Sequence, residues 1–111
     1  MTNPKGTKHE TDIVNRATEA GFPAQRMPKY GARDRGDIHL HDGDGTLWVI
    51  EAKNRKGYDL PTAMKQLAAE KANAGAERGV AVIKRNGVGD VGRSFVVMEL
   101  DDWLETLPRP Y

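Results

Sequence analysis

The chain has 111 residues, with 17 Lys and Arg against 16 Asp and Glu, no cysteine, and 38% hydrophobic residues. This length predicts one small domain with a single core, and the lack of cysteine excludes cysteine nucleophiles and Cys-based zinc sites. No apolar run reaches the roughly 18 residues of a membrane-spanning helix, and residues 1–8 lack the apolar segment of a secretory signal. We therefore expect a soluble, cytoplasmic protein with no membrane partner.

The net charge of +1 is unevenly distributed along the chain. Lys and Arg minus Asp and Glu gives +3 for residues 1–36, −3 for 37–53, +4 for 54–93 and −3 for 94–111. A compact acidic segment thus lies between two basic ones. That order suits an acidic, metal-binding centre within a basic rim, although mixed charge on a solvated surface explains it without any function.

The first third of the chain predicts a helix and an edge strand. Residues 1–8 are polar and predict a disordered tail. Apolar residues recur at helical spacing over residues 9–20, and Gly21 follows where a helix commonly ends. Residues 22–28 predict a short edge strand, because a proline in it cannot donate to a sheet ladder. Residues 29–36 then form a basic, glycine-containing loop.

The middle of the chain predicts a β-hairpin. Residues 37–41 alternate between polar and apolar side chains, an Asp-Gly-Asp-Gly turn follows, and residues 46–53 are rich in β-branched and aromatic side chains. A three-residue loop over 43–45 would pair Asp42 with Thr46.

This register determines which side chains meet across the hairpin. It places Leu40 opposite Trp48, with Asp37 opposite Glu51 at the far end. One face of the hairpin is then wholly apolar, whereas a slip of one residue would mix polar and apolar side chains on both faces.

The second half of the chain predicts a helix over residues 60–74, with Pro61 in its first turn and Gly75 near its end. Residues 80–84 and 94–100 predict buried strands joined by a glycine-rich turn.

A short last helix follows, capped by Asp101 or Asp102, with Trp103, Leu104 and Leu107 facing the core. Trp48 and Met64 are further core candidates rather than base-stacking groups. The element order αβββαββα indicates a single α/β domain over residues 9–107, built on a central mixed β-sheet flanked by helices. Residues 108–111 form a C-terminal tail.

Three side chains with complementary chemistry converge at one end of the hairpin. Directly opposed residues have Cβ atoms roughly 4.5 to 5.5 Å apart, which brings Asp37 close to Glu51. Lys53 projects from the same face as Glu51. Two carboxylates and the backbone carbonyl of Ala52 suit Mg²⁺, which takes oxygen ligands and keeps several waters. Lys53 is placed to orient or deprotonate a water and to meet a phosphate. The set indicates phosphodiester hydrolysis.

These residues resemble a known motif. Gly36-Asp37, followed by a strand ending in Ile50-Glu51-Ala52-Lys53, resembles the PD-(D/E)XK nuclease motif, with Gly36 in place of the proline. Glu10 matches the additional acidic residue that many members carry on an N-terminal helix. The layout is most similar to the small archaeal-type and phage Holliday junction resolvases.

The resemblance implies a restriction-endonuclease-like αβββαβ core and a Mg²⁺-dependent endonuclease, with Mn²⁺ as a substitute and no other cofactor. Its substrate would be branched DNA in recombination or repair, in the host cytoplasm if a phage encodes it. Asp37, Glu51 and Ala52 would hold the metal, Glu10 would support it or a second ion, and Lys53 would align the attacking water. A junction with two symmetric strands calls for two active sites, hence a C2 homodimer.

Basic residues flank the proposed site and would track a DNA backbone. Those in the loops are Lys29, Arg33, Arg35, Arg55 and Lys56. The resemblance adds a phosphate or water contact from Lys65 and Gln66 on the second predicted helix. Scattered surface charge and plain solvation are the alternatives for both groups.

Other interpretations of the same residues stay open. Asp37, Glu51 and Lys53 would also fit an exposed ion pair, although two opposed carboxylates without a cation repel one another. Glu10 would fit a first-turn glutamate favoured by the helix dipole. His39 and His41 are expected to be polar residues on the half-exposed side of the hairpin rather than zinc ligands.

Two alternative functions also remain. One is another structure-selective, nicking or restriction-type nuclease. The other is a DNA-binding module that has the fold without turnover.

Overall fold

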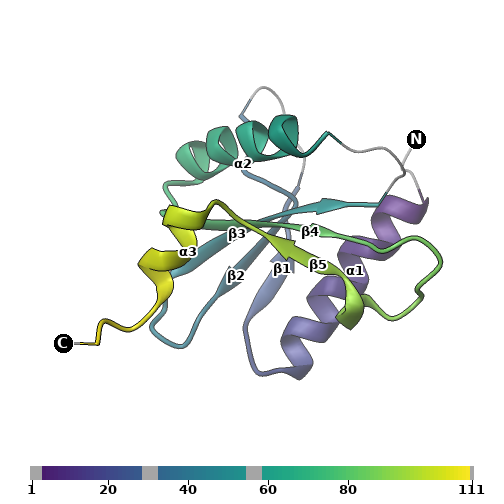
Figure 1. Cartoon of the computed structure of the whole chain (residues 1–111). Coiled ribbons are helices and arrows are strands. Elements are labelled where there is room, and N and C mark those ends of the chain that lie inside the picture. Colours follow the sequence, from purple (N-terminus) through teal and green to yellow (C-terminus); the bar gives the residue numbers. More distant parts are fainter. Residues whose placement is uncertain (1–3, 29–32, 55–58, 111) are drawn as a thin grey trace.

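The computed structural model describes residues 4–28, 33–54 and 59–110. Its elements follow the predicted order with one added 3₁₀ turn, η1 (Figure 1). They are α1 (Pro4–Glu19), β1 (Ala24–Arg26), β2 (Ile38–His41), β3 (Leu47–Lys53), α2 (Leu60–Ala74), β4 (Arg78–Ile83), η1 (Val91–Arg93), β5 (Phe95–Val97) and α3 (Leu100–Thr106).

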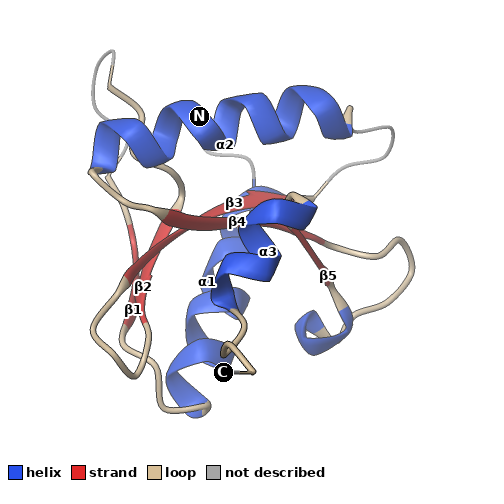
Figure 2. Cartoon of the chain, turned by 60° about the vertical axis from the view of Figure 1, so that its left-hand side comes forward, coloured by secondary structure: helices blue, strands red, loops and turns tan. Residues whose placement is uncertain are grey.

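The strands form one mixed sheet in the order β1-β2-β3-β4-β5. The pair β3 and β4 is parallel, and the other neighbouring pairs are antiparallel. Helices α1 and α2 lie on opposite faces of this sheet (Figure 2). The predicted α/β architecture with a central mixed sheet is confirmed.

The hairpin has the predicted register. Leu40 is paired with Trp48, the Asp42 N–H donates to the Thr46 carbonyl at 3.0 Å, and Gly45 has a φ of 80°. Strand β2 begins one residue later than predicted, because the Asp37 N–H donates to the Ile50 carbonyl at 3.1 Å and leaves the regular ladder. Asp37 therefore precedes the strand rather than opening it.

Each face of the sheet has its own apolar layer, as alternation along the strands requires. Toward α1, the buried side chains are Ile13, Ile38, Ile50, Val80 and Val82, with Trp48 packed against them. Toward α2, they are Val49, Ala63, Leu67, Ala81 and Ile83. These layers fix the ends of β2 and β3 between the two helices.

The first helix begins earlier than predicted. Residues 4–8 belong to α1, so a disordered tail over residues 1–8 is wrong for that part. Pro4 is compatible with a first helical position, where its missing N–H costs nothing. Lys8 and Asp12 form an i,i+4 ion pair of 2.7 Å. His9 and Glu10, which follow Lys8, are buried.

Helix α2 has the predicted bounds. The Asp59 side chain accepts from the Thr62 N–H at its start, and Gly75 ends it in a left-handed conformation with φ 68°. No helix in residues 4–28, 33–54 and 59–110 combines the length and apolar character needed to cross a bilayer.

The C-terminal region differs most from the sequence prediction. Strand β5 has three residues rather than the seven predicted over 94–100, and it lies at the edge of the sheet instead of being buried. Helix α3 is preceded by Glu99, with no side-chain capping bond, so Asp101 and Asp102 are not its caps.

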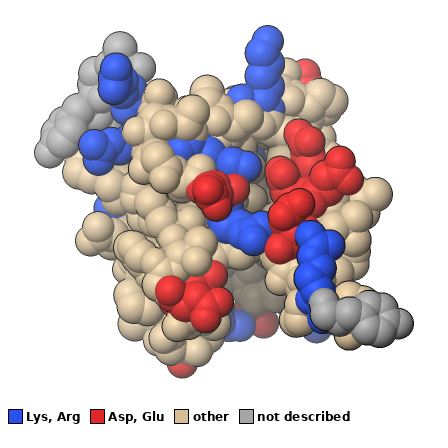
Figure 3. Space-filling model, turned by 90° about the vertical axis from the view of Figure 1, so that its left-hand side faces the viewer, with Lys and Arg blue, Asp and Glu red and all other residues tan. Residues whose placement is uncertain are grey.

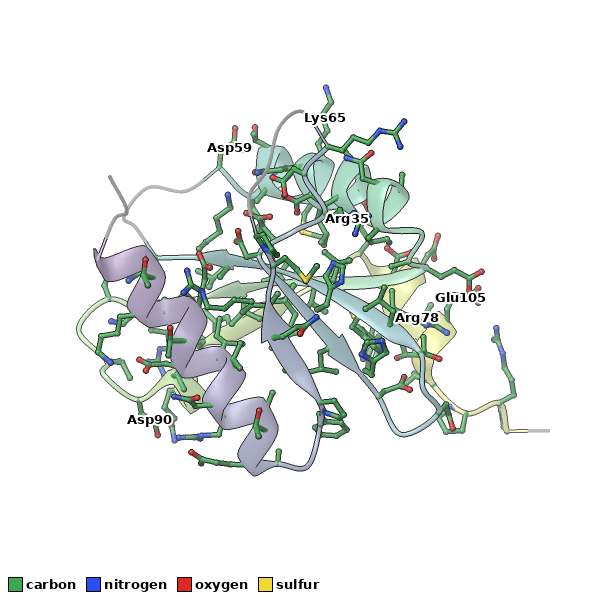
Figure 4. The ribbon with its side chains drawn as sticks, turned by 180° about the vertical axis from the view of Figure 1, so that it is seen from behind. Arg35, Asp59, Lys65, Arg78, Asp90 and Glu105 are labelled. Atoms are coloured by element: carbon green, nitrogen blue, oxygen red, sulfur yellow. The ribbon has the colours of Figure 1, made fainter. Side chains whose placement is uncertain are left out.

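The side chains expected to face the core from α3 are instead exposed. Trp103, Leu104 and Leu107 are 48%, 42% and 40% exposed. Polar contacts hold this helix: the Arg78 guanidinium donates to the Glu105 carbonyl at 3.0 Å, and the two residues lie side by side in Figure 4. The prediction that these side chains lie in the core is wrong, because no other layer of the described residues covers α3.

Candidate active site

A cleft of about 770 Å³ opens where β3 ends, beside the first turns of α1 and the residue that precedes β2. Its lining includes six residues that the sequence singled out: Glu10, Asp37, Glu51, Ala52, Lys53 and Gln66. The structure therefore brings the predicted acidic pair, the lysine and the N-terminal glutamate to one place.

Glu51 is a buried carboxylate with one oxygen available. The residue is 4% exposed, and its Oε1 forms an ion pair of 3.2 Å with the Lys53 Nζ. Among the described residues, no N–H group reaches its Oε2. Burial raises the pKa of Glu51, and the nearby Asp37 carboxylate raises it further, while Lys53 opposes both. A cation at the free oxygen would relieve this cost.

Lys53 is held in place from two sides. Besides its ion pair with Glu51, its Nζ donates to the Gln66 Oε1 at 3.1 Å, and its side chain is only 15% exposed. The sequence predicted Gln66 as a phosphate or water contact. In the structure it positions the lysine ammonium at the cleft.

Asp37 is fixed by backbone contacts. Its Oδ2 accepts the Ala52 N–H at 2.8 Å, and its carbonyl accepts the Met27 N–H at 2.8 Å from the segment that follows β1. These bonds hold the carboxylate beside Glu51, as the electrostatic effect on the Glu51 pKa requires.

Gly36 explains the departure from the motif's proline. Its φ is +93°, a value that proline, fixed near −65°, cannot adopt. A Cβ at this position would also overlap the Val49 Cγ1. Glycine lets the chain turn sharply into Asp37 against the buried strand β3.

Glu70 is a site residue that the sequence analysis missed. It lies on α2, is 1% exposed, and its carboxyl lies near that of Glu51. Burial, the Glu51 carboxyl and then Asp34 raise the pKa of Glu70 to about 10. Glu70 is therefore neutral at pH 7.

Arg26 is a second residue without a sequence prediction. Its Nε lies 3.2 Å from the Glu10 Oε1, and both residues line the cleft. The guanidinium is partly exposed while the Glu10 carboxylate is nearly buried. Glu10 is thus paired with a cation of this chain in the present structure.

The donor set fits a hard cation held by two carboxylates. Among residues 4–28, 33–54 and 59–110, no three His, Asp or Glu side chains are gathered closely enough to form a metal site. Asp37 and Glu51 with bound waters nevertheless match Mg²⁺, which dehydrates reluctantly and often takes only one or two protein carboxylates. A metal role for Glu10 and for the Ala52 carbonyl stays a prediction.

The predicted DNA-contacting residues have different outcomes. Arg33, Arg35 and Lys65 are exposed and outside the cleft lining, and Figure 4 shows Lys65 projecting from α2 away from the sheet. Lys29, Arg55 and Lys56 lie outside the described residues. On the described part of the side drawn in Figure 3, acidic and basic side chains lie next to one another, so that side does not carry charge of one sign.

The two hairpin histidines are not equivalent. His41 is exposed, as expected, but His39 is buried at 8% exposure. Its Nε2 lies 2.9 Å from the Arg35 carbonyl, to which it donates as the Nε2–H tautomer. The expectation of a half-exposed His39 is wrong, because the loop before β2 covers it.

Comparison with solved structures gives an informative similarity. No protein-family model matches the chain, and no curated protein matches its sequence. The solved structure of Hjc, a Holliday junction resolvase from the archaeal hyperthermophile Archaeoglobus fulgidus, is 27% identical, with a TM-score of 0.52. The match covers 70% of this chain and 68% of Hjc. The chain therefore has the restriction-endonuclease-like α/β fold of Hjc.

Proposed function

We propose that this protein is a divalent-metal-dependent DNA endonuclease that resolves Holliday junctions. The observation that carries the proposal is the convergence of Asp37, Glu51 and Lys53 in one cleft. The similarity to Hjc supports it, since that protein is a Holliday junction resolvase with the same fold.

Each side chain has a role that follows from its contacts. Asp37 and Glu51 would hold Mg²⁺ or Mn²⁺. The Ala52 N–H fixes Asp37, and Glu51 has a buried oxygen that no N–H of the described residues reaches. When bound, such an ion lowers the pKa of its water and stabilises the charge that develops on the phosphate. Lys53 orients the attacking water or the scissile phosphate with an ammonium held between Glu51 and Gln66.

The surroundings keep these groups ready for reaction. Neutral Glu70, buried near Glu51, would add no second negative charge beside that carboxylate. Catalysis by charge stabilisation depends on such preorganisation, because groups already in place need not rearrange in the transition state. Arg33, Arg35 and Lys65 would contact the DNA backbone outside the cleft.

The branched substrate calls for two copies of the cleft. Resolution requires one nick in each of two symmetric strands, which a C2 homodimer supplies. A protein that stayed monomeric in solution would contradict the resolvase proposal while leaving a simpler nicking nuclease open.

A panel of labelled DNA substrates tests the proposal. A four-way junction, a flap and a linear duplex of matched sequence are incubated with the full chain and Mg²⁺. We expect paired, symmetric nicks near the branch point of the junction and much slower cleavage of the other two. Equal cleavage of flap or linear duplex would favour another nuclease class. Tight binding with no cleavage in Mg²⁺ or Mn²⁺ would favour a DNA-binding module.

A further inference from the structure

The segment of residues 33–36 is held by side chains from two other elements of the fold. Asn73 on α2 donates its side-chain amide to the Asp34 carbonyl at 2.8 Å, across 39 positions of the chain. His39 on β2 donates from its Nε2 to the Arg35 carbonyl at 2.9 Å. A helix and a strand thus bind two consecutive carbonyl groups of this short segment.

The two bonds fix both peptide planes that flank Arg35. The Asp34 carbonyl belongs to the peptide before the Arg35 Cα, and the Arg35 carbonyl belongs to the peptide after it. Because a residue has only two soft backbone dihedrals, holding both planes sets the direction in which its side chain leaves the backbone. The Asp34 Oδ1 also accepts the Gly36 N–H at 2.8 Å. The Arg35 residue itself is exposed and lies beside α2 in Figure 4.

Neither of the two donors is the residue that its own element favours. His39 is paired with Val49 in the buried layer toward α2 and is 8% exposed. Burying an imidazole costs free energy unless its polar atoms are bonded, and an apolar side chain would fill this layer without that cost. Asn73 is exposed on α2 between two alanines, which are better helix formers. The contribution of both residues is therefore their bond to the segment beside Arg35.

We infer that Asn73 and His39 are positioning residues for DNA binding, which fix the backbone on both sides of Arg35 so that its guanidinium meets a DNA phosphate. Asp34, the preceding residue, lines the cleft, so this contact lies at the edge of the site. An arginine whose backbone is already held loses less conformational entropy when it binds. The inference rests on the proposed function only in taking DNA as the ligand.

Binding of the full chain to a labelled four-way junction in EDTA, without cleavage, tests the inference. Arg35→Ala should weaken binding by about tenfold and lower the slope of its salt dependence by about one. Asn73→Ala should weaken binding by about fivefold with the slope unchanged, because the phosphate contact still forms but the segment must first be ordered. The control Asn15→Ala, the same change at an exposed position of α1, should leave binding unchanged.

A double-mutant cycle separates positioning from a direct contact of Asn73 with DNA. In the Arg35→Ala background, Asn73→Ala should cause no further loss, because the side chain that it positions is gone. Equal losses in both backgrounds, or no loss from Asn73→Ala alone, would overturn the inference. Urea denaturation verifies that each variant is folded.

His39 allows a test by conservative replacement. His39→Leu removes the donor and should weaken binding by about fivefold. His39→Gln supplies an amide nitrogen in place of the Nε2 and should bind within about twofold of wild type. Equal losses from the two variants would contradict the role of this bond. Failure of the nuclease proposal looks different: DNA is bound with these dependences but is not cut when Mg²⁺ is added.

Discussion

The cleft and the C-terminal elements β5 and α3 depart from the usual distribution of side chains in opposite ways. At the cleft, carboxylates are buried: Glu10, Asp37, Glu51 and Glu70 are each 7% exposed or less. At β5 and α3, aromatic and aliphatic side chains lie in the open, and α3 has no buried residue at all.

Both departures are costly, which is why they are informative. Burying an ionisable carboxyl without a cation disfavours its charged form, and exposing apolar area forfeits about 25 cal/mol per Å² that burial would supply. Each region therefore lacks something that a bound species would provide. The cleft has more carboxyl groups than cations, with Arg26 and Lys53 against Glu10, Asp34, Asp37 and Glu51. The apolar side chains of β5 and α3 lack cover.

The largest expected effect concerns the cleft. Asp37→Asn keeps an oxygen to accept the Ala52 N–H but removes a negative charge from the proposed metal site. Cleavage should fall on the order of a thousandfold, with the fold intact. The rate of junction nicking in Mg²⁺ measures this, with Asp44→Asn on the exposed hairpin turn as the matched control. Unchanged nicking by Asp37→Asn would remove this residue from the site.

Gly36→Ala should damage the cleft through its backbone. The φ of +93° and the overlap with Val49 Cγ1 both oppose a Cβ. We expect a loss of about 2 to 4 kcal/mol in the free energy of unfolding, measured by urea denaturation. Gly43→Ala is the control, since nothing lies within 4 Å of its added Cβ. Equal stability of the two variants would contradict the described turn into Asp37.

The buried carboxyl pair predicts a pH dependence in metal-free protein. The pKa of Glu70 rises from an ordinary 4.5 to about 10 in the fold, so the folded chain keeps a proton that the unfolded chain has lost between these values. The contribution of Glu70 to the free energy of unfolding is then fully present below its ordinary pKa and is lost as pH rises toward the raised value. Glu70→Gln carries no such proton. It should gain roughly 1 to 2 kcal/mol relative to wild type between about pH 5 and pH 9.

Urea denaturation of both proteins in EDTA at the two pH values measures this difference. Parallel pH dependences for wild type and Glu70→Gln would show that Glu70 is ionised in the fold. An ionised Glu70 would then need a partner of opposite charge.

The smallest expected effect concerns α3. Leu100 is 67% exposed, so Leu100→Ser should change the free energy of unfolding by about 0.5 kcal/mol or less. Ile38→Ala, at a fully buried core position, should cost about 3 kcal/mol. A large loss from Leu100→Ser would mean that α3 is part of the monomer's core.

Much of the fold could be predicted because its signals are local. The polar and apolar alternation on both strands of the hairpin permits one register, and Pro61 in the first turn with Gly75 after the last indicates both ends of α2. Asp37, Glu51 and Lys53 follow from that register and from the motif. The predicted start of α1 and the predicted burial of the α3 side chains were wrong, because both depend on what packs against each helix.

The two site residues that the sequence analysis missed, Glu70 and Arg26, differ in whether the sequence contains a signal for them. Glu70 follows Ala63 and Leu67 at helical spacing, so a carboxyl fell on the buried face of α2 and marked an unusual environment. Arg26 has no comparable signal. It reaches Glu10 only because α1 and β1 are brought together by the fold, a contact across 16 positions that no local pattern encodes.

Single-turnover cleavage of a labelled four-way junction by wild type and Glu51→Gln tests the central claim most directly. With Mg²⁺, wild type should nick two opposed strands symmetrically, and Glu51→Gln should bind the junction with little loss of affinity while cutting it on the order of a thousandfold more slowly. Equal cleavage by both proteins would contradict the assignment of this cleft as the catalytic centre.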